Sequence, residues 1–95
     1  MAILSIDIET YSSVELKTHG VYKYVEAPDF EILLFSYAFD DGPVQIIDLT
    51  KEKLPQFLIN ALLDPNTIKS AYNANFERVC LSKYLDLHLP INQWR

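Results

Sequence analysis

The stretch Ala2-Ile3-Leu4-Ser5-Ile6-Asp7-Ile8-Glu9-Thr10 decides the fold of this chain. Apolar side chains recur at every second position, and a period of two is that of a β-strand. Residues 2–8 are therefore expected to form a strand that is apolar on nearly both sides, as central strands are. Asp7 and Glu9 share one face of this strand and lie at its end.

The rest of the sequence alternates between strand and helix patterns. Between residues 10 and 30 only one helical turn is expected, stopped by Gly20. The turn sequence Asp40-Asp41-Gly42-Pro43 joins two apolar segments into an antiparallel hairpin. The two segments of the hairpin are expected to be strands at 31–39 and 44–49. A helix over about 54–62, with Pro55 in its first turn, and a strand at 67–72 are expected to follow. The last expected element is a helix at 74–85, capped by Asn73 or Asn75. The order β-ββ-α-β-α predicts an α/β fold with a mixed sheet.

The bulk composition limits the class of protein. With 95 residues and a net charge of -5, residues 1–95 are expected to form part of a single domain that does not coat nucleic acid through a broad basic surface. The single cysteine, Cys80, excludes an internal disulfide and favours a reducing compartment. No signal peptide and no membrane-spanning run is recognised, so a cytoplasmic location in a bacterial or phage-infected cell is expected.

Two carboxylates side by side near a buried strand end are the first candidate site. Period two places the Cα atoms of Asp7 and Glu9 about 6.5 Å apart on one face. Their mutual repulsion and desolvation would be offset by a divalent cation, which prefers oxygen ligands. Phosphodiester cleavage commonly uses two such ions. Taken alone, however, Asp-x-Glu is a weak signal, because both acids are usually solvent-exposed.

A second acidic motif, Asn73-Ala74-Asn75-Phe76-Glu77, follows an apolar strand and opens a helix. Glu77 lies in the first turn, where the helix dipole favours a negative charge. Ordinary capping explains this motif by itself. The combination of both motifs, each at the end of an apolar strand, is far more specific than either one.

These motifs resemble those of the ribonuclease H-like 3′–5′ exonuclease superfamily, which has four acidic metal ligands. Asp7-Ile8-Glu9-Thr10 matches its first motif, and Asn73, Phe76 and Glu77 match its second. The chain is most similar to the exonuclease portion of phage-type family A DNA polymerases, and further matches are Gly20-Val21-Tyr22-Lys23-Tyr24 and Pro28-Asp29-Phe30-Glu31-Ile32-Leu33-Leu34.

The resemblance implies a two-metal-ion 3′–5′ exonuclease that hydrolyses terminal nucleotides from DNA during proofreading. Asp7, Glu9 and Glu77 would be the catalytic ligands of Mg²⁺ or Mn²⁺. Thr10 would lie close to the terminal nucleotide. Tyr11 is a further candidate for binding substrate, because it neighbours the acids. Asn73 and Phe76 would help to place the substrate strand. The implied partners are a single-stranded DNA 3′ end and the polymerase domain of the same parent chain, with no membrane.

The chain departs from the family pattern in two ways. Glu77 replaces the usual aspartate, so its carboxylate reaches one methylene further. No third acidic motif follows, and the last strand and helix of the ribonuclease H-like sheet are missing. We therefore expect an incomplete N-terminal part of the exonuclease domain that is weak or inactive alone. The tail from Leu89 to Arg95 is similar to the lead-in to the missing strand.

Two other interpretations remain at this stage. One is a non-catalytic ribonuclease H-like module that binds a partner or forms a homo-oligomer through an unfilled sheet edge. The other is an RNA-processing exonuclease. The remaining candidates are interpreted as structural: Phe76, Val79, Cys80 and Tyr84 as the buried face of the last helix, and Tyr24, Phe35, Tyr37, Phe39 and Phe57 as packing residues.

Overall fold

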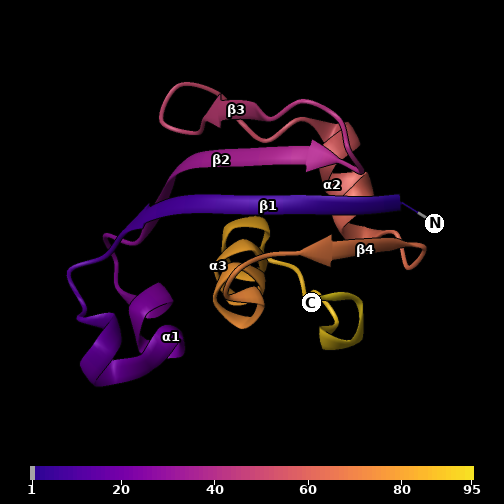
Figure 1. Ribbon diagram of the computed structural model, residues 1–95. Coiled ribbons are helices and arrows are strands. Elements are labelled where there is room, and N and C mark those ends of the chain that lie inside the picture. Colours follow the sequence, from indigo (N-terminus) through magenta and orange to yellow (C-terminus); the bar gives the residue numbers. More distant parts are fainter. Residues whose placement is uncertain (1) are drawn as a thin grey trace.

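The computed structural model describes residues 2–95 (Figure 1). Its elements in chain order are β1 (Ala2–Tyr11), α1 (Leu16–Glu26), β2 (Glu31–Phe39), β3 (Gln45–Asp48), α2 (Gln56–Leu63), β4 (Thr67–Ser70), α3 (Ala74–Leu85) and a short 3₁₀ turn η1 (Ile91–Gln93). The expected strands and the helix at 74–85 are confirmed, and the mixed α/β class with them.

The four strands form one sheet in the order β3-β2-β1-β4. β2 is antiparallel to both β1 and β3, as the hairpin sequence predicts. β4 is parallel to β1 and pairs with it only from Ala2 to Ser5, because β4 is short. β1 is therefore the central strand over its first half and loses its β4 neighbour before Asp7.

One face of this sheet carries the whole hydrophobic core. The alternate side chains Leu4, Ile6 and Ile8 of β1 point to that face and are buried, as are Phe35 of β2 and Ile47 of β3. Buried side chains from all three helices join the same cluster, and Figure 1 shows the helices beneath and behind the sheet. Within residues 2–95, no helix packs on the opposite face, which carries Ile3, Ser5, Asp7 and Glu9.

The segment between β1 and β2 is more regular than its sequence suggests. β1 continues to Tyr11, so Asp7 and Glu9 lie inside the strand and not at its end. The expected helical turn before Gly20 is present and stops there, because Gly20 has non-helical φ and ψ angles, but a second helical stretch that was not expected continues α1 to Glu26. Gly20 kinks the helix with a φ of 82°, a left-handed value that glycine adopts without a Cβ clash, and the helix resumes afterwards.

The second helix also differs in detail. Pro55 precedes α2 in an extended conformation and so does not lie within the first turn. Leu58 and Leu62 are fully buried, but Phe57 is more than half exposed. Its ring makes an edge contact with that of Tyr37, at a centroid distance of 6.2 Å. The assignment of Phe57 to the core is therefore only partly right.

The C-terminal residues begin to add a strand beside β4. Trp94 pairs with Lys69 in parallel, and Arg95 N donates to Lys69 O at 2.8 Å while Ala71 N donates to Arg95 O at 2.9 Å. The tail therefore partly covers the sheet edge that was expected to be unfilled. Self-association through that edge stays a prediction.

A fully buried lysine holds this tail in place. The ammonium group of Lys69, which has 0% exposure, donates to the carbonyl of Asp64 at 2.9 Å and to Oε1 of Gln93 at 2.7 Å. Burial lowers the pKa of Lys69, and the charge of Asp64 offsets part of that shift.

Among the described residues, no helix is long and apolar enough to cross a membrane.

Candidate metal site beside the central strand

The candidate site forms where β4 ends. The last residue of β4, Ser70, pairs with Ser5, so the flank of β1 beyond that point has no strand beside it. The chain then passes through residues 71–73 and enters α3, which contacts β1. This geometry brings Glu77 of α3 near Asp7 of β1. The structure thus brings together two of the three acids that the sequence motifs predict.

Glu77 is an unusual acid, because only 5% of its surface is exposed and its Oε2 atom has no hydrogen-bond partner. Burial raises the pKa of the Glu77 carboxyl, and the nearby charge of Asp7 raises it further, while backbone groups of Glu77 and Asn73 offset part of the shift. A buried carboxylate oxygen without a partner costs free energy unless a proton or a cation satisfies it. The site therefore favours either a protonated Glu77 or a bound cation.

The charge of Glu77 reaches further along α3. Cys80 lies one turn later and is fully buried, which confirms its assignment to the core. Burial, and then the charge of Glu77, raise the pKa of its thiol to about 12. A thiol with such a pKa is not a nucleophile at neutral pH.

Glu9 lies on the same face of β1 as Asp7, and both are exposed. The pairing of β1 with β2 shifts register between Glu9 and Thr10, which marks a β-bulge or irregularity. Bulges re-aim side chains and occur often next to active sites. Within residues 2–95, however, no three His, Cys, Asp or Glu side chains form a group already arranged to hold a metal ion.

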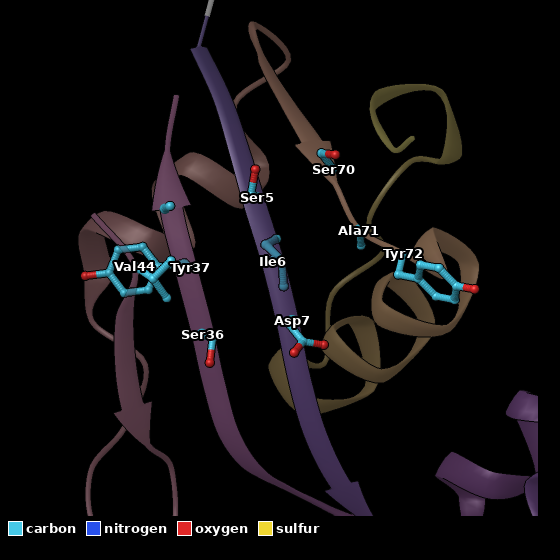
Figure 2. A pocket seen from close by; sticks show the side chains of 10 residues that line it. Ser5, Ile6, Asp7, Ser36, Tyr37, Val44, Ser70, Ala71 and Tyr72 are labelled. Atoms are coloured by element: carbon cyan, nitrogen blue, oxygen red, sulfur yellow. The ribbon is translucent and has the colours of Figure 1, made fainter. Parts of the chain in front are cut away.

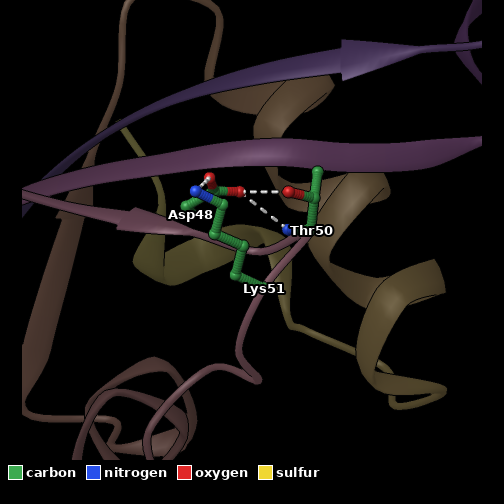
Figure 3. Close-up of polar contacts among 3 residues, drawn as sticks. All are labelled: Asp48, Thr50 and Lys51. Carbon is green, nitrogen blue, oxygen red and sulfur yellow. Dashed lines mark hydrogen bonds and ion pairs between the residues drawn. The ribbon is translucent and has the colours of Figure 1, made fainter.

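Asp48, another acid of the sheet, differs from Glu77 because its carboxylate has local hydrogen-bond partners. Asp48 shares a face with Leu34, its partner in the pairing of β2 with β3. Its Oδ1 accepts bonds from the N–H and the hydroxyl of Thr50 at 2.9 and 2.5 Å, and Lys51 lies 4.0 Å away (Figure 3). These bonds from Thr50 lower the pKa of Asp48. Its charge is satisfied locally, whereas that of Glu77 is not.

The four residues expected to bind substrate fall into two groups. Thr10 and Phe76 both contact Tyr24. The hydroxyl of Tyr24 lies 2.8 Å from Thr10 Oγ1, and the centroid of its ring lies 5.8 Å from the ring centroid of Phe76. This arrangement fixes both residues beside the acids. Tyr11 and Asn73 are exposed instead.

The expected cap of α3 is only partly right. Asn73 occupies the N-cap position, but its side chain makes no capping bond. The side chain of Asn75 accepts a bond from Arg78 at 3.0 Å, and Arg78 also donates to the carbonyl of Leu89 at 3.1 Å. Sequence reasoning missed the burial of Arg78. Its contact with the tail depends on long-range packing that no local pattern signals.

A shallow cavity of about 290 Å³ lies across the open face of the sheet (Figure 2). Asp7 lines it from β1, and Tyr72 lines it from the segment between β4 and α3. In Figure 2 the side chain of Asp7 lies on β1, whereas the ring of Tyr72 points away from the strands. Of the three candidate metal ligands, Asp7 lines this recess, which is open to solvent.

Fold and candidate site together describe a mixed α/β domain in which Asp7 and Glu77 lie near each other just beyond the end of β4. Comparison with known proteins gives one curated relative, the DNA polymerase of Bacillus phage SP02, which is 60% identical over 96 residues. The match covers 100% of this chain but only 15% of the polymerase, so the chain corresponds in length to a small part of that relative. No protein-family model matches the chain. No solved structure matches it either.

Proposed function

We propose that this chain is the N-terminal part of a ribonuclease H-like 3′–5′ exonuclease domain belonging to a phage-type DNA polymerase. The observation that carries the proposal is the approach of Asp7 to the buried, unpaired carboxylate of Glu77 at the point where β4 ends. The similarity of the whole chain to a segment of a phage DNA polymerase supports the same assignment. The substrate would be the 3′ end of single-stranded DNA, removed during proofreading in an infected bacterial cell.

Asp7, Glu9 and Glu77 are the proposed ligands of Mg²⁺ or Mn²⁺. The donor set is chemically suitable, because hard divalent cations take carboxylate oxygens and the Oε2 atom of Glu77 lacks any other partner. A bound cation would supply activation of water and stabilisation of the leaving oxygen. Since these three acids are not yet arranged as a closed ligand set, the chain alone is proposed to be weak or inactive.

The surrounding residues would orient the substrate and hold the acids. Tyr24 is buried and bonds to Thr10, so the backbone just beyond Glu9 is fixed relative to α1. Phe76 packs on the same ring and so holds the first turn of α3 in place. The exposed side chains of Tyr11 and Asn73 are free to contact a nucleotide.

Titration of the isotope-labelled chain with Mn²⁺, followed by NMR line broadening, tests the metal site. We expect broadening centred on the backbone amides of Asp7, Glu9 and Glu77. Glu77→Gln should weaken the effect, whereas Asp41→Asn, which changes an exposed acid of the hairpin turn, should leave it unchanged. Broadening spread evenly over all surface acids would overturn the proposal.

A non-catalytic binding module is the second candidate. Its supporting observation is that the described residues hold no ready-made group of three metal-ligating side chains. It predicts that Mn²⁺ shows no preference for Glu77.

A further inference from the structure

The strand β3 is the outermost strand at one edge of the sheet, and within residues 2–95 no other strand pairs with its outer side (Figure 1). On its inner side β3 forms an antiparallel ladder with β2. Leu49 N donates to Leu33 O at 2.9 Å, which marks these two as a hydrogen-bonded pair. Because such pairs alternate along an antiparallel ladder, every second residue of β3 before Leu49 also faces β2 with its backbone. The N–H and C=O groups of Val44 and Ile46 therefore point to the free side.

The side chains along this edge are apolar and exposed. The exposed fraction is 67% for Val44 and 65% for Ile46, and Phe57 of α2, exposed by 53%, lines a groove together with Gln45. Natural sheet edges are often protected against strand pairing by charged side chains, but residues 44–47 (Val-Gln-Ile-Ile) carry no charge. This part of β3 therefore has both the free backbone groups and the apolar side chains of a strand-pairing surface.

We propose that β3 pairs with the β3 strand of a second copy of this chain, in an antiparallel dimer whose two-fold axis passes beside Gln45. In this register Val44 lies opposite Ile46 of the second copy, and Ile46 lies opposite Val44 of the second copy. The outward N–H and C=O groups of these two residues then meet their counterparts in four hydrogen bonds. The β-branched side chains pair across the same strands, and such cross-strand pairs stabilise a sheet.

The turn after β3 selects this register. The carbonyl of Asp48 accepts bonds from the N–H groups of Lys51 and Glu52, both at 3.1 Å, so the free edge ends before Asp48. A dimer centred on Ile46 would need that carbonyl, whereas one centred on Gln45 uses only free groups.

The size and charge of the contact set its expected strength. A pairing of three residues buries less than the roughly 1,600 Å² of a standard interface, which is typical of transient association. Each copy also carries a net charge of -5, so the two copies repel each other at low ionic strength. We therefore expect a dissociation constant of about 100 µM that falls as salt is added. This inference is independent of the proposed exonuclease function.

Sedimentation equilibrium at chain concentrations up to about 1 mM tests the dimer. The mean mass should rise from 11.0 kDa toward twice that value. Ile46→Lys places a charge on the edge strand and should weaken association at least about tenfold. Ile91→Lys is the matched control and should leave association unchanged, because Ile91 is exposed by 69% and lies on η1, beside the opposite edge of the sheet.

Disulfide cross-linking under mild oxidation tests the register. In the proposed dimer the two Gln45 residues form a non-hydrogen-bonded pair with Cα atoms about 4.5 Å apart, so Gln45→Cys should form a covalent dimer readily. The two Val44 residues are offset by two positions and lie more than about 7 Å apart, so Val44→Cys should cross-link slowly. Cys80 is buried and should not compete.

Three results would each overturn the inference. One is a chain that stays monomeric up to about 1 mM, which is also the result expected if this edge pairs only with a strand of another protein. Another is an equal loss of association in Ile46→Lys and Ile91→Lys. The third is cross-linking of Gln45→Cys that is no faster than that of Val44→Cys.

Discussion

Replacing Glu77 by glutamine keeps the shape of the side chain and removes its charge. In the folded chain this carboxylate is buried, its Oε2 atom has no partner and its pKa is raised by burial and by Asp7. Leaving a buried charged acceptor unsatisfied costs about 1–3 kcal/mol. We therefore expect Glu77→Gln to raise the free energy of unfolding at neutral pH, without metal, by about 1 kcal/mol, since the new amide N–H₂ also lacks partners.

The pH dependence gives the sign of this effect. Below the ordinary glutamate pKa of 4.5, Glu77 is protonated in both the folded and the unfolded chain, so its charge contributes no difference. As the pH rises through 4.5 and then through the higher folded pKa, the unfolded chain loses its proton first, and the folded state loses stability relative to it. The Glu77→Gln chain does not lose stability in this way, because its side chain does not ionise. The difference in free energy of unfolding between the two chains should therefore grow with pH and then level off.

Thermal unfolding followed by circular dichroism at a series of pH values, with EDTA present, measures this difference. For a domain of this size a gain of about 1 kcal/mol corresponds to about 4–8 °C in Tm. Glu52→Gln, at an exposed site, is the control and should show no such trend. The prediction would be contradicted if the gain in stability of Glu77→Gln over the unmodified chain were smaller at neutral pH than at acid pH.

Three further predictions concern the framework around the site. Lys69→Ala should lower the free energy of unfolding by about 2–3 kcal/mol and speed hydrogen exchange at the amide of Arg95, because the buried ammonium group holds the tail. Unchanged exchange at Arg95 would contradict this. Cys80 should react with Ellman's reagent only on unfolding, given its burial and a pKa of about 12; a native rate equal to that of the unfolded chain would exclude the buried assignment. Tyr24→Phe should cost about 1 kcal/mol in urea unfolding through loss of the bond to Thr10, and no change would show that this bond is not formed.

Some elements could be predicted because local chemistry decides them. The alternation in β1, the turn sequence at residues 40–43 and the helical spacing in α3 each act over a few residues, and the structure confirms all three elements. The part of α1 after Gly20 was missed because its sequence has no strong apolar stripe, and its contacts with α3 are long-range packing that the sequence does not display.

The candidate site was predictable only in part, for a related reason. The motifs identified Asp7 and Glu77, but the short length of β4, which opens the flank of β1 to α3, is a property of the pairing between strands. The burial of Glu77 and of Lys69 follows from that pairing and from the tail. Polar residues are usually exposed, so a local pattern gives no reason to expect either of them inside.

A manganese soak of crystals of this chain, with the anomalous difference map calculated at the manganese edge, tests the central claim most directly. We expect a peak bonded to carboxylate oxygens of Asp7 and Glu77, with Glu9 turned toward it. An unoccupied position between Asp7 and Glu77 at high manganese concentration, with density only at exposed acids such as Asp41, would contradict it.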